Sequence, residues 1–184
     1  MLWWIWVIIA LAVLIVLMLI NYFNKFVILG NRIDNSLSQI DVQLRKRADL
    51  VPNLIETVKG YAKHEKSIIN SVTEARKALL GAADITSRVK AGNQLQQALK
   101  SIFALAENYP NLKANENFLH LQQELAAIED KVAYSRQFYN DSILDYNNSV
   151  ESFPGNIFAS IYGKREKKFL EIPAEARAVP KVSF

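Results

Sequence analysis

The chain opens with an uninterrupted apolar run. Residues 2–20 contain no charged residue, proline or glycine. These 19 residues would form a helix of ~28 Å at ~1.5 Å per residue, close to the hydrocarbon thickness of a bilayer. Three tryptophans stand at the start of the run, and Tyr22 and Phe23 follow its end, as in the aromatic belts of membrane proteins. The pattern predicts a transmembrane anchor over residues 1–21, which contacts the lipid bilayer through residues 2–20.

A cleaved signal peptide is the alternative interpretation of this run. Such a peptide needs a basic stretch before the apolar core and small residues at a cleavage site. No Lys or Arg precedes the run, and residues 21–23 are Asn-Tyr-Phe. We therefore expect an uncleaved anchor. Because Lys25 and Arg32 follow the run, the positive-inside rule favours a bundle on the cytoplasmic side of the bacterial inner (cytoplasmic) membrane.

Beyond the anchor, apolar residues recur in steps of three and four, as on one face of an amphipathic helix. The first such stripe is Ile33, Leu37, Ile40, Leu44, Ala48, Val51, Ile55, Val58 and Ala62. It continues at Ile69, Val72 and Leu79, which predicts one rod, kinked at Pro52 and continuous through Gly60. The alternative is that the chain folds back near Gly60, which would reverse the direction of every later helix and return Phe153 towards the bilayer.

Two further helices are predicted, over residues 86–107 and 115–153. The sequence Tyr109-Pro110-Asn111 separates them, since the residue before a proline avoids the helical region. The later helix has the most regular spacing of the chain. Its expected core positions are Phe118, Leu121, Leu125, Ile128, Val132, Ser135, Tyr139, Tyr146, Val150 and Phe153. The sequence thus predicts an all-α protein, with a helical bundle over residues 22–153 behind the anchor.

Residues 154–184 are predicted to form a short amphipathic piece over 157–169 and then an extended tail. Pro173 and Pro180 exclude a continuous helix in the tail, and Val182 and Phe184 alternate as on one face of a strand. Such a segment suits docking into a groove or onto another chain. The alternative is that the tail folds back over its own bundle.

Charge and composition narrow the possible functions. The net charge of +4 is too small for the basic footprint of a nucleic-acid-binding protein, so we expect no nucleic acid as a partner. The absence of cysteine excludes disulfides, thiolate metal sites and cysteine nucleophiles. Residues 116–153 carry a net charge of −5, against +9 for the rest of the chain. This difference favours contact between the acidic helix and more basic helices.

Three stretches together resemble one protein family, the LemA family of bacterial membrane proteins. They are residues 41–54 (DVQLRKRADLVPNL), 107–118 (ENYPNLKANENF) and 136–141 (RQFYND). Ser135 departs from the family pattern, where we would expect alanine. The resemblance implies an up-and-down bundle of three to four helices behind one membrane span, and no established catalytic activity. Because relatives include a magnetosome-membrane protein, and others are encoded beside membrane proteases or other envelope proteins, it also implies a scaffolding role at the inner membrane.

Candidate chemistry is sparse. His64 and His120 do not have the spacing of the metalloprotease or di-iron motifs, and the acidic residues of the last long helix are explained by a solvated face. We expect no catalytic residue, metal or cofactor. Two basic clusters are candidate interaction sites, namely Arg45, Lys46 and Arg47, and Lys164, Arg165, Lys167 and Lys168. Val182 and Phe184 in the tail are the remaining candidates for contact with a partner.

These observations favour a non-enzymatic, membrane-anchored helical scaffold that acts through protein contacts. The expected partners are a second copy of the chain, as a homo-oligomer, and other envelope or membrane proteins such as proteases. A membrane-shaping or lipid-binding protein that touches lipid with residues 157–168 is the first alternative. An enzymatic or metal-binding bundle is the second.

Overall fold

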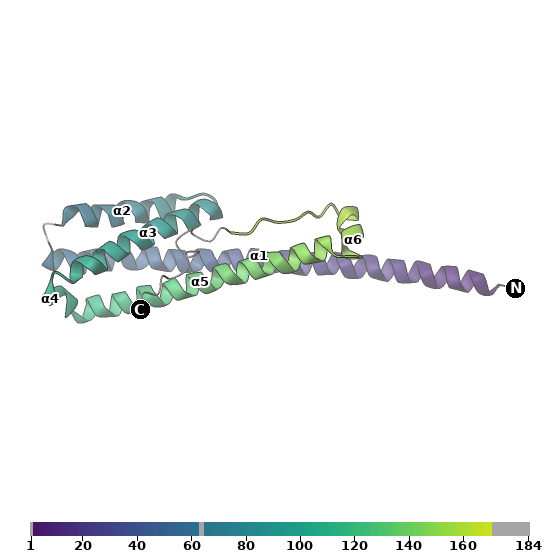
Figure 1. Cartoon of the computed structure of the whole chain (residues 1–184), viewed down its shortest axis with the longest axis horizontal. Helices are drawn as coiled ribbons and strands as arrows, with labels where there is room; N and C mark the ends of the chain where they lie inside the picture. Colours follow the sequence, from purple (N-terminus) through teal and green to yellow (C-terminus); the bar gives the residue numbers. More distant parts are fainter. Residues whose placement is uncertain (1, 63–64, 171–184) are drawn as a thin grey trace, which may run out of the picture. The chain divides into compact units, whose positions relative to one another are not determined.

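The computed structural model describes residues 2–62 and 65–170, and within these ranges it contains helices and no strands. The helices are α1 (Trp3–Tyr61), α2 (Lys66–Gly81), α3 (Ile85–Ala106), α4 (Pro110–Lys113), α5 (Glu116–Glu151) and α6 (Gly155–Ile161) (Figure 1). The chain forms two compact units. The bundle unit comprises residues 36–137, and the terminal unit comprises the described residues on either side of it.

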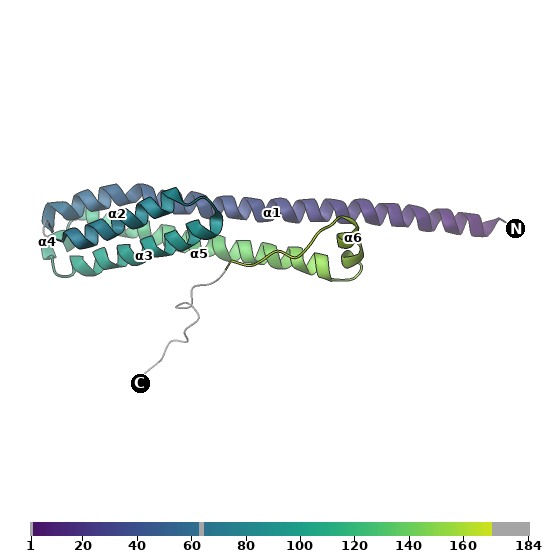
Figure 2. The same ribbon diagram turned by 90° about the horizontal axis from the view of Figure 1, so that it is seen from above.

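The bundle unit is an up-and-down arrangement of the later part of α1, α2, α3 and the first part of α5. Figures 1 and 2 both show α2 and α3 running alongside α1. Arg76 of α2 donates from Nε to the Ala48 carbonyl of α1 at 2.8 Å. Arg136 of α5 donates from Nη2 to Oδ1 of Asn93 of α3 at 2.8 Å, and Phe103 meets Phe118 edge to face further along the same two helices. Neighbouring helices in the bundle therefore run antiparallel.

The core of the bundle unit follows most of the predicted stripes, but Leu37 and Ile55 of the first stripe are only half-buried, and Leu54 is buried in place of Ile55. Its most deeply buried apolar residues are Ile40, Leu44, Val51, Leu54, Val58, Val72, Leu95, Ile102, Leu112 and Phe118. Each fully buried side chain of this kind contributes about 1.5–3 kcal/mol to stability. The predicted fold class, an apolar N-terminal helix followed by a long helical bundle, is confirmed.

The predicted continuity of the first rod through Gly60 is wrong. Helix α1 ends at Tyr61 and α2 begins at Lys66, after which the chain folds back along α1. The apolar stripe could not reveal this turn, because Ala62 and Ile69 are seven residues apart. Seven residues are two helical turns, so the stripe keeps its phase across a break.

The other predicted helices are close to α3 and α5. Asp84 caps α3 by accepting a hydrogen bond from the backbone N–H of Ser87 at 2.9 Å. Pro110 opens the short α4, where the missing N–H of a proline is tolerated. One core assignment is wrong, since Phe153 lies beyond the end of α5 with 81% of its surface exposed.

The amphipathic piece predicted over residues 157–169 is shorter than expected. Helix α6 ends at Ile161, and Gly163 follows with a φ of 62°. Glycine reaches this left-handed conformation without steric penalty, and it commonly terminates helices. The backbone N–H of Lys164 then bonds to the carbonyl of Ala159 at 2.8 Å. Residues 164–170 follow as a non-helical segment, which we call the strap.

Candidate functional site: an aromatic collar and a C-terminal strap

The terminal unit contains the apolar segment expected to cross a membrane. By length and composition, α1 can span a bilayer, with a mean hydropathy of 3.0 over its most apolar 18 residues. None of that window is buried within the protein. Leu11, near its middle, is 56% exposed. A run this apolar and uncovered needs an apolar environment, which residues 2–62 and 65–170 do not supply.

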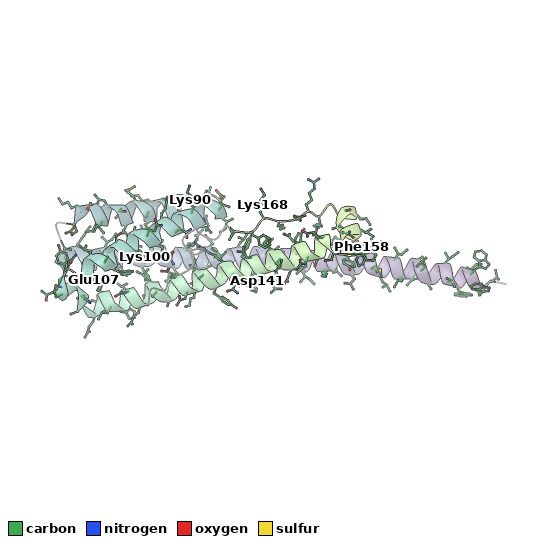
Figure 3. All side chains as sticks on the ribbon, viewed as in Figure 1. Lys90, Lys100, Glu107, Asp141, Phe158 and Lys168 are labelled. Carbon is green, nitrogen blue, oxygen red and sulfur yellow. The ribbon has the colours of Figure 1, made fainter. Side chains whose placement is uncertain are left out.

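Six aromatic side chains gather where the apolar segment ends, and we call them the collar. They are Tyr22, Phe23 and Phe26 of α1, Tyr146 of α5, and Phe158 and Tyr162 at α6. Tyr22 and Phe158 stack with ring centroids 4.7 Å apart, and Phe23 meets Tyr162 edge to face at 5.4 Å. Phe158 is labelled in Figure 3, where α6 lies beside α1. Such aromatic pairs add about 0.5–1.5 kcal/mol each beyond their buried area.

A hydrogen bond fixes the collar against the apolar segment. The Tyr162 hydroxyl donates to the backbone carbonyl of Leu19 at 2.8 Å. Leu19 lies within the predicted span, so α6 sits at the last turn of the apolar run. The fit is close at Gly155, because a Cβ there would collide with the carbonyl oxygen of Ser149 and come within 3.3 Å of the Tyr22 ring.

Two asparagines of α5 hold the strap by its backbone. The side chain of Asn147 accepts from the Lys167 N–H at 2.9 Å and donates to the Lys167 carbonyl at 2.9 Å. Asn140 does the same with Leu170, at 3.0 and 3.3 Å. Asn140 and Asn147 are two helical turns apart, or ~10 Å, which matches three residues of extended chain. The strap therefore runs antiparallel to α5, and it is held through backbone N–H and carbonyl groups, which every residue except proline can supply.

The basic side chains of the strap have no acidic partner within the described residues. Lys164, Arg165, Lys167 and Lys168 form no ion pair in the part of the chain that the structure describes, and the Lys167 ammonium lies 5.3 Å from the centre of the Tyr146 ring. Lys168 is labelled on the strap in Figure 3. A role for these four residues in an interaction stays a prediction. Val182 and Phe184, the candidates in the tail, lie outside the described residues.

In the other basic cluster, residues 45–47, two side chains are exposed to solvent and one is buried in the core. Arg45 is exposed and pairs with Asp41 at 3.0 Å, and Arg88 pairs with the same carboxylate. Lys46 is exposed. Arg47 is only 1% exposed and donates from Nη1 to the Gly92 carbonyl at 3.4 Å. Of these three adjacent basic residues, only Arg47 lies on the buried face of the helix, because consecutive helical positions point in different directions.

Arg47 belongs to a buried polar cluster between the helices of the bundle. Burial lowers the pKa of Arg47, and the nearby Glu129 opposes the shift. Arg136 is affected in the same way, and the charge of Arg47 lowers its pKa further. Gln96 bonds to Glu129. Arg47 and Glu129 also line a cavity of about 230 Å³ together with Leu99, Phe103 and Leu125. The cluster therefore brings together Arg47 of α1, Gln96 of α3 and Glu129 of α5.

The described side chains also bear on whether the chain could hold a metal ion. Within residues 2–62 and 65–170, no three His, Asp or Glu side chains are grouped so that they could hold a metal ion. His120 is exposed, with its Nε2 4.0 Å from Glu124. His64 lies outside the described residues.

The sequence interpretation missed the collar and the two strap-holding asparagines. Two signals were present. Tyr22 and Phe26 are four residues apart, on one helix face, and so continue the aromatic belt beyond the apolar run. Asn140 and Asn147 share a face of α5 at a spacing of seven, next to buried Tyr139 and Tyr146. Neither signal identifies its partner, since the partners are more than ten residues away in sequence.

Comparison with known proteins agrees with this architecture. Residues 36–184 match the LemA family. The magnetosome protein MamQ of Magnetospirillum gryphiswaldense is 26% identical, with 91% of this chain and 71% of that protein covered. The magnetosome protein MamQ 2 of Paramagnetospirillum magneticum is 25% identical, over 85% of this chain and 67% of its own length. Protein LemA of Metamycoplasma hominis is 25% identical, and the match covers 70% of this chain and 59% of the relative. The chain, a helical protein with an apolar N-terminal helix, belongs to the LemA family.

Proposed function

We propose that this protein is a non-enzymatic, membrane-anchored helical scaffold of the bacterial inner membrane. The observation that supports it best is α1, a single 59-residue helix. Its first part is an exposed apolar segment, and its later part supplies core residues such as Ile40 and Val51. In this proposal one helix serves both as membrane anchor and as one of the helices of the bundle. In this proposal the bundle is cytoplasmic, because the basic residues Lys25 and Arg32 follow the apolar run and the positive-inside rule favours that side.

The polar groups of the bundle serve helix-to-helix contacts, which supports a role without catalysis. Asp41 of α1 pairs with Arg88 of α3, Glu129 of α5 lies near the buried Arg47 of α1, and the Tyr109 hydroxyl donates to Glu65 at 3.1 Å. These groups join parts of the bundle that are distant in sequence. The names of the relatives, MamQ and LemA, state no reaction.

The scaffold acts through contact with a second copy of the chain and with other membrane proteins. Large apolar side chains remain on the surface of the bundle unit, with Tyr134 68% and Leu80 49% exposed. Aromatic side chains such as Tyr134 often anchor protein interfaces. The tail beyond residue 170, with Val182 and Phe184, is a second contact region in this proposal.

Photocrosslinking in intact membranes tests the proposed function. A photoreactive phenylalanine analogue replaces Tyr134, Leu80 or, as an exposed polar control, Lys90 in the full-length protein. We expect irradiation to crosslink the variants at Tyr134 or Leu80 to protein, and the variant at Lys90 far less. A doubled mass indicates a second copy of the chain, and another defined mass indicates a different protein. If irradiation gives no crosslink to any protein at any of the three positions, a scaffold that acts through the bundle is contradicted.

A further inference from the structure

We propose that the outward face of α6, together with Phe153, forms a second membrane contact that lies in the lipid interface beside the anchor. The inference rests on the proposed function in one respect, namely that the apolar segment of α1 spans the bilayer. It adds a lipid-facing surface outside that segment. The partner is the leaflet at the C-terminal end of the span, with anionic headgroups.

The position of α6 follows from its contacts with α1. The Tyr162 hydroxyl donates to the Leu19 carbonyl at 2.8 Å, and Phe158 stacks on Tyr22 at 4.7 Å. Leu19 is in the last turn of the apolar run, and Tyr22 follows that run directly. Tyrosine is enriched at this depth in membrane proteins because its ring is apolar and its hydroxyl is polar. Helix α6 is therefore at the level of the bilayer interface.

Both faces of α6 carry apolar side chains, and exposure of the outward face to water would not explain the large ones that it presents. Gly155, Phe158 and Ala159 are buried against the rest of the terminal unit. On the outward side, Ile157 is 51% exposed and Ile161 is 60% exposed, and the two are one helical turn apart. Phe153, just before the helix, is 81% exposed. Three large apolar side chains thus stand uncovered within a few residues, next to the segment that already enters lipid.

Basic residues border this apolar surface. Lys25 follows the apolar run, and Lys164 and Arg165 come directly after α6. Lys25, Tyr22, Ser152 and Phe153 also line a groove of about 240 Å³ beside Gly155. An apolar surface with flanking Lys and Arg is the composition of segments that lie in a membrane interface, and the basic residues favour anionic lipid.

A second copy of the chain is the other possible occupant of this surface. The continuity with the apolar segment favours lipid, because none of the most apolar window of α1 is buried and α6 adjoins its end. A protein interface at this level would compete with the lipid that surrounds the span. The two occupants are distinguished by the experiment.

The test uses spin labels in full-length protein reconstituted into vesicles of phosphatidylcholine and phosphatidylglycerol. Because the chain contains no cysteine, single substitutions Ile157→Cys and Ile161→Cys give one labelled site each. Leu144→Cys is the matched control, since Leu144 is apolar and 49% exposed but lies on α5. Leu11→Cys, within the apolar segment, reports whether the anchor itself is in lipid. Accessibility of each label to oxygen and to a water-soluble nickel complex gives its depth.

We expect labels at 157 and 161 to be severalfold more accessible to oxygen than to nickel, and the label at 144 to show the reverse. Raising the fraction of phosphatidylglycerol should deepen the labels at 157 and 161 and leave 144 unchanged. Nickel accessibility at 157 and 161 equal to that at 144, with Leu11→Cys still in lipid, would overturn the inference alone. Labels at 157 and 161 that are shielded from both reagents, with spectra broadened at high protein density, would also overturn it, because they would indicate contact between copies. Nickel access at residue 11 would contradict the membrane anchor of the proposed function.

Discussion

Replacing Ile102 by aspartate is expected to unfold the bundle unit. Ile102 is completely buried in α3, in the layer of side chains between α3 and its neighbours. Ile102→Asp removes the apolar side chain and introduces a carboxylate without a partner. The two effects together should lower the free energy of unfolding by at least about 4 kcal/mol. Urea denaturation of the detergent-solubilised protein, followed by circular dichroism, measures this loss.

Leu119→Asp is the matched control. Leu119 is 41% exposed on α5, so its replacement adds the same charge to the surface. The control should change stability by no more than about 0.5 kcal/mol. Equal denaturation midpoints for the two variants would mean that the periodic apolar stripes do not form the core.

Gly155→Ala is expected to detach α6 from the terminal unit. The added Cβ would collide with the Ser149 carbonyl oxygen, and neither that backbone atom nor the stacked Tyr22 ring can yield without moving α6. Overpacking of this kind lowers stability by about 1–3 kcal/mol. Hydrogen exchange should quicken at the amides of α6, and at Lys167 and Leu170 in the strap, while the amides of α3 keep their protection.

Gly30→Ala, in the same unit, is the matched control and is expected to raise stability rather than lower it. No atom lies within 4 Å of the position that its Cβ would occupy, and Gly30 is inside α1. Alanine favours the helix over glycine by about 0.5–1 kcal/mol, so this variant should be slightly more stable. If Gly155→Ala, like Gly30→Ala, leaves the hydrogen exchange of the α6 amides unchanged, the close packing described at Gly155 is contradicted.

Much of the bundle could be predicted from the apolar spacing. The steps of three and four from Phe118 to Tyr139 placed these residues on one face of α5, and the structure buries them. Regular spacing over five helical turns indicates a buried helix face, because each step must bring the next side chain to the same side. The apolar segment at the start of α1 was equally clear, since its 19 residues carry no charge and none of its most apolar window is buried.

The direction of the helices could not be predicted in the same way. Periodicity reports which face of a helix is buried, and it carries no information about where the chain turns. The turn after Tyr61 has neither a proline nor a glycine within residues 61–65, so local turn signals are weak there. Gly60, inside the last turn of α1, was the nearest indication.

The candidate site was predicted less well than the fold. Phe153 looked like the end of a core stripe, yet Pro154 follows it and α5 ends at Glu151, so its side chain leaves the helical face. The sequence also did not show that Arg47, between Lys46 and Ala48 in a basic cluster, is the buried member of that cluster. Its environment depends on Glu129 and Gly92, which are distant in sequence. Such long-range pairs require the assembled bundle.

Alkaline extraction of membranes tests the central claim most directly, namely that α1 is both membrane anchor and bundle helix. The full-length protein and a variant lacking residues 2–20 are expressed in a bacterium, and their membranes are washed at high pH before the N-terminus is sequenced. We predict that the full-length protein stays in the membrane with residues 2–20 attached, and that the truncated variant is released with its helical circular dichroism spectrum retained. Release of the full-length protein, or a mature N-terminus near residue 22, would contradict the claim.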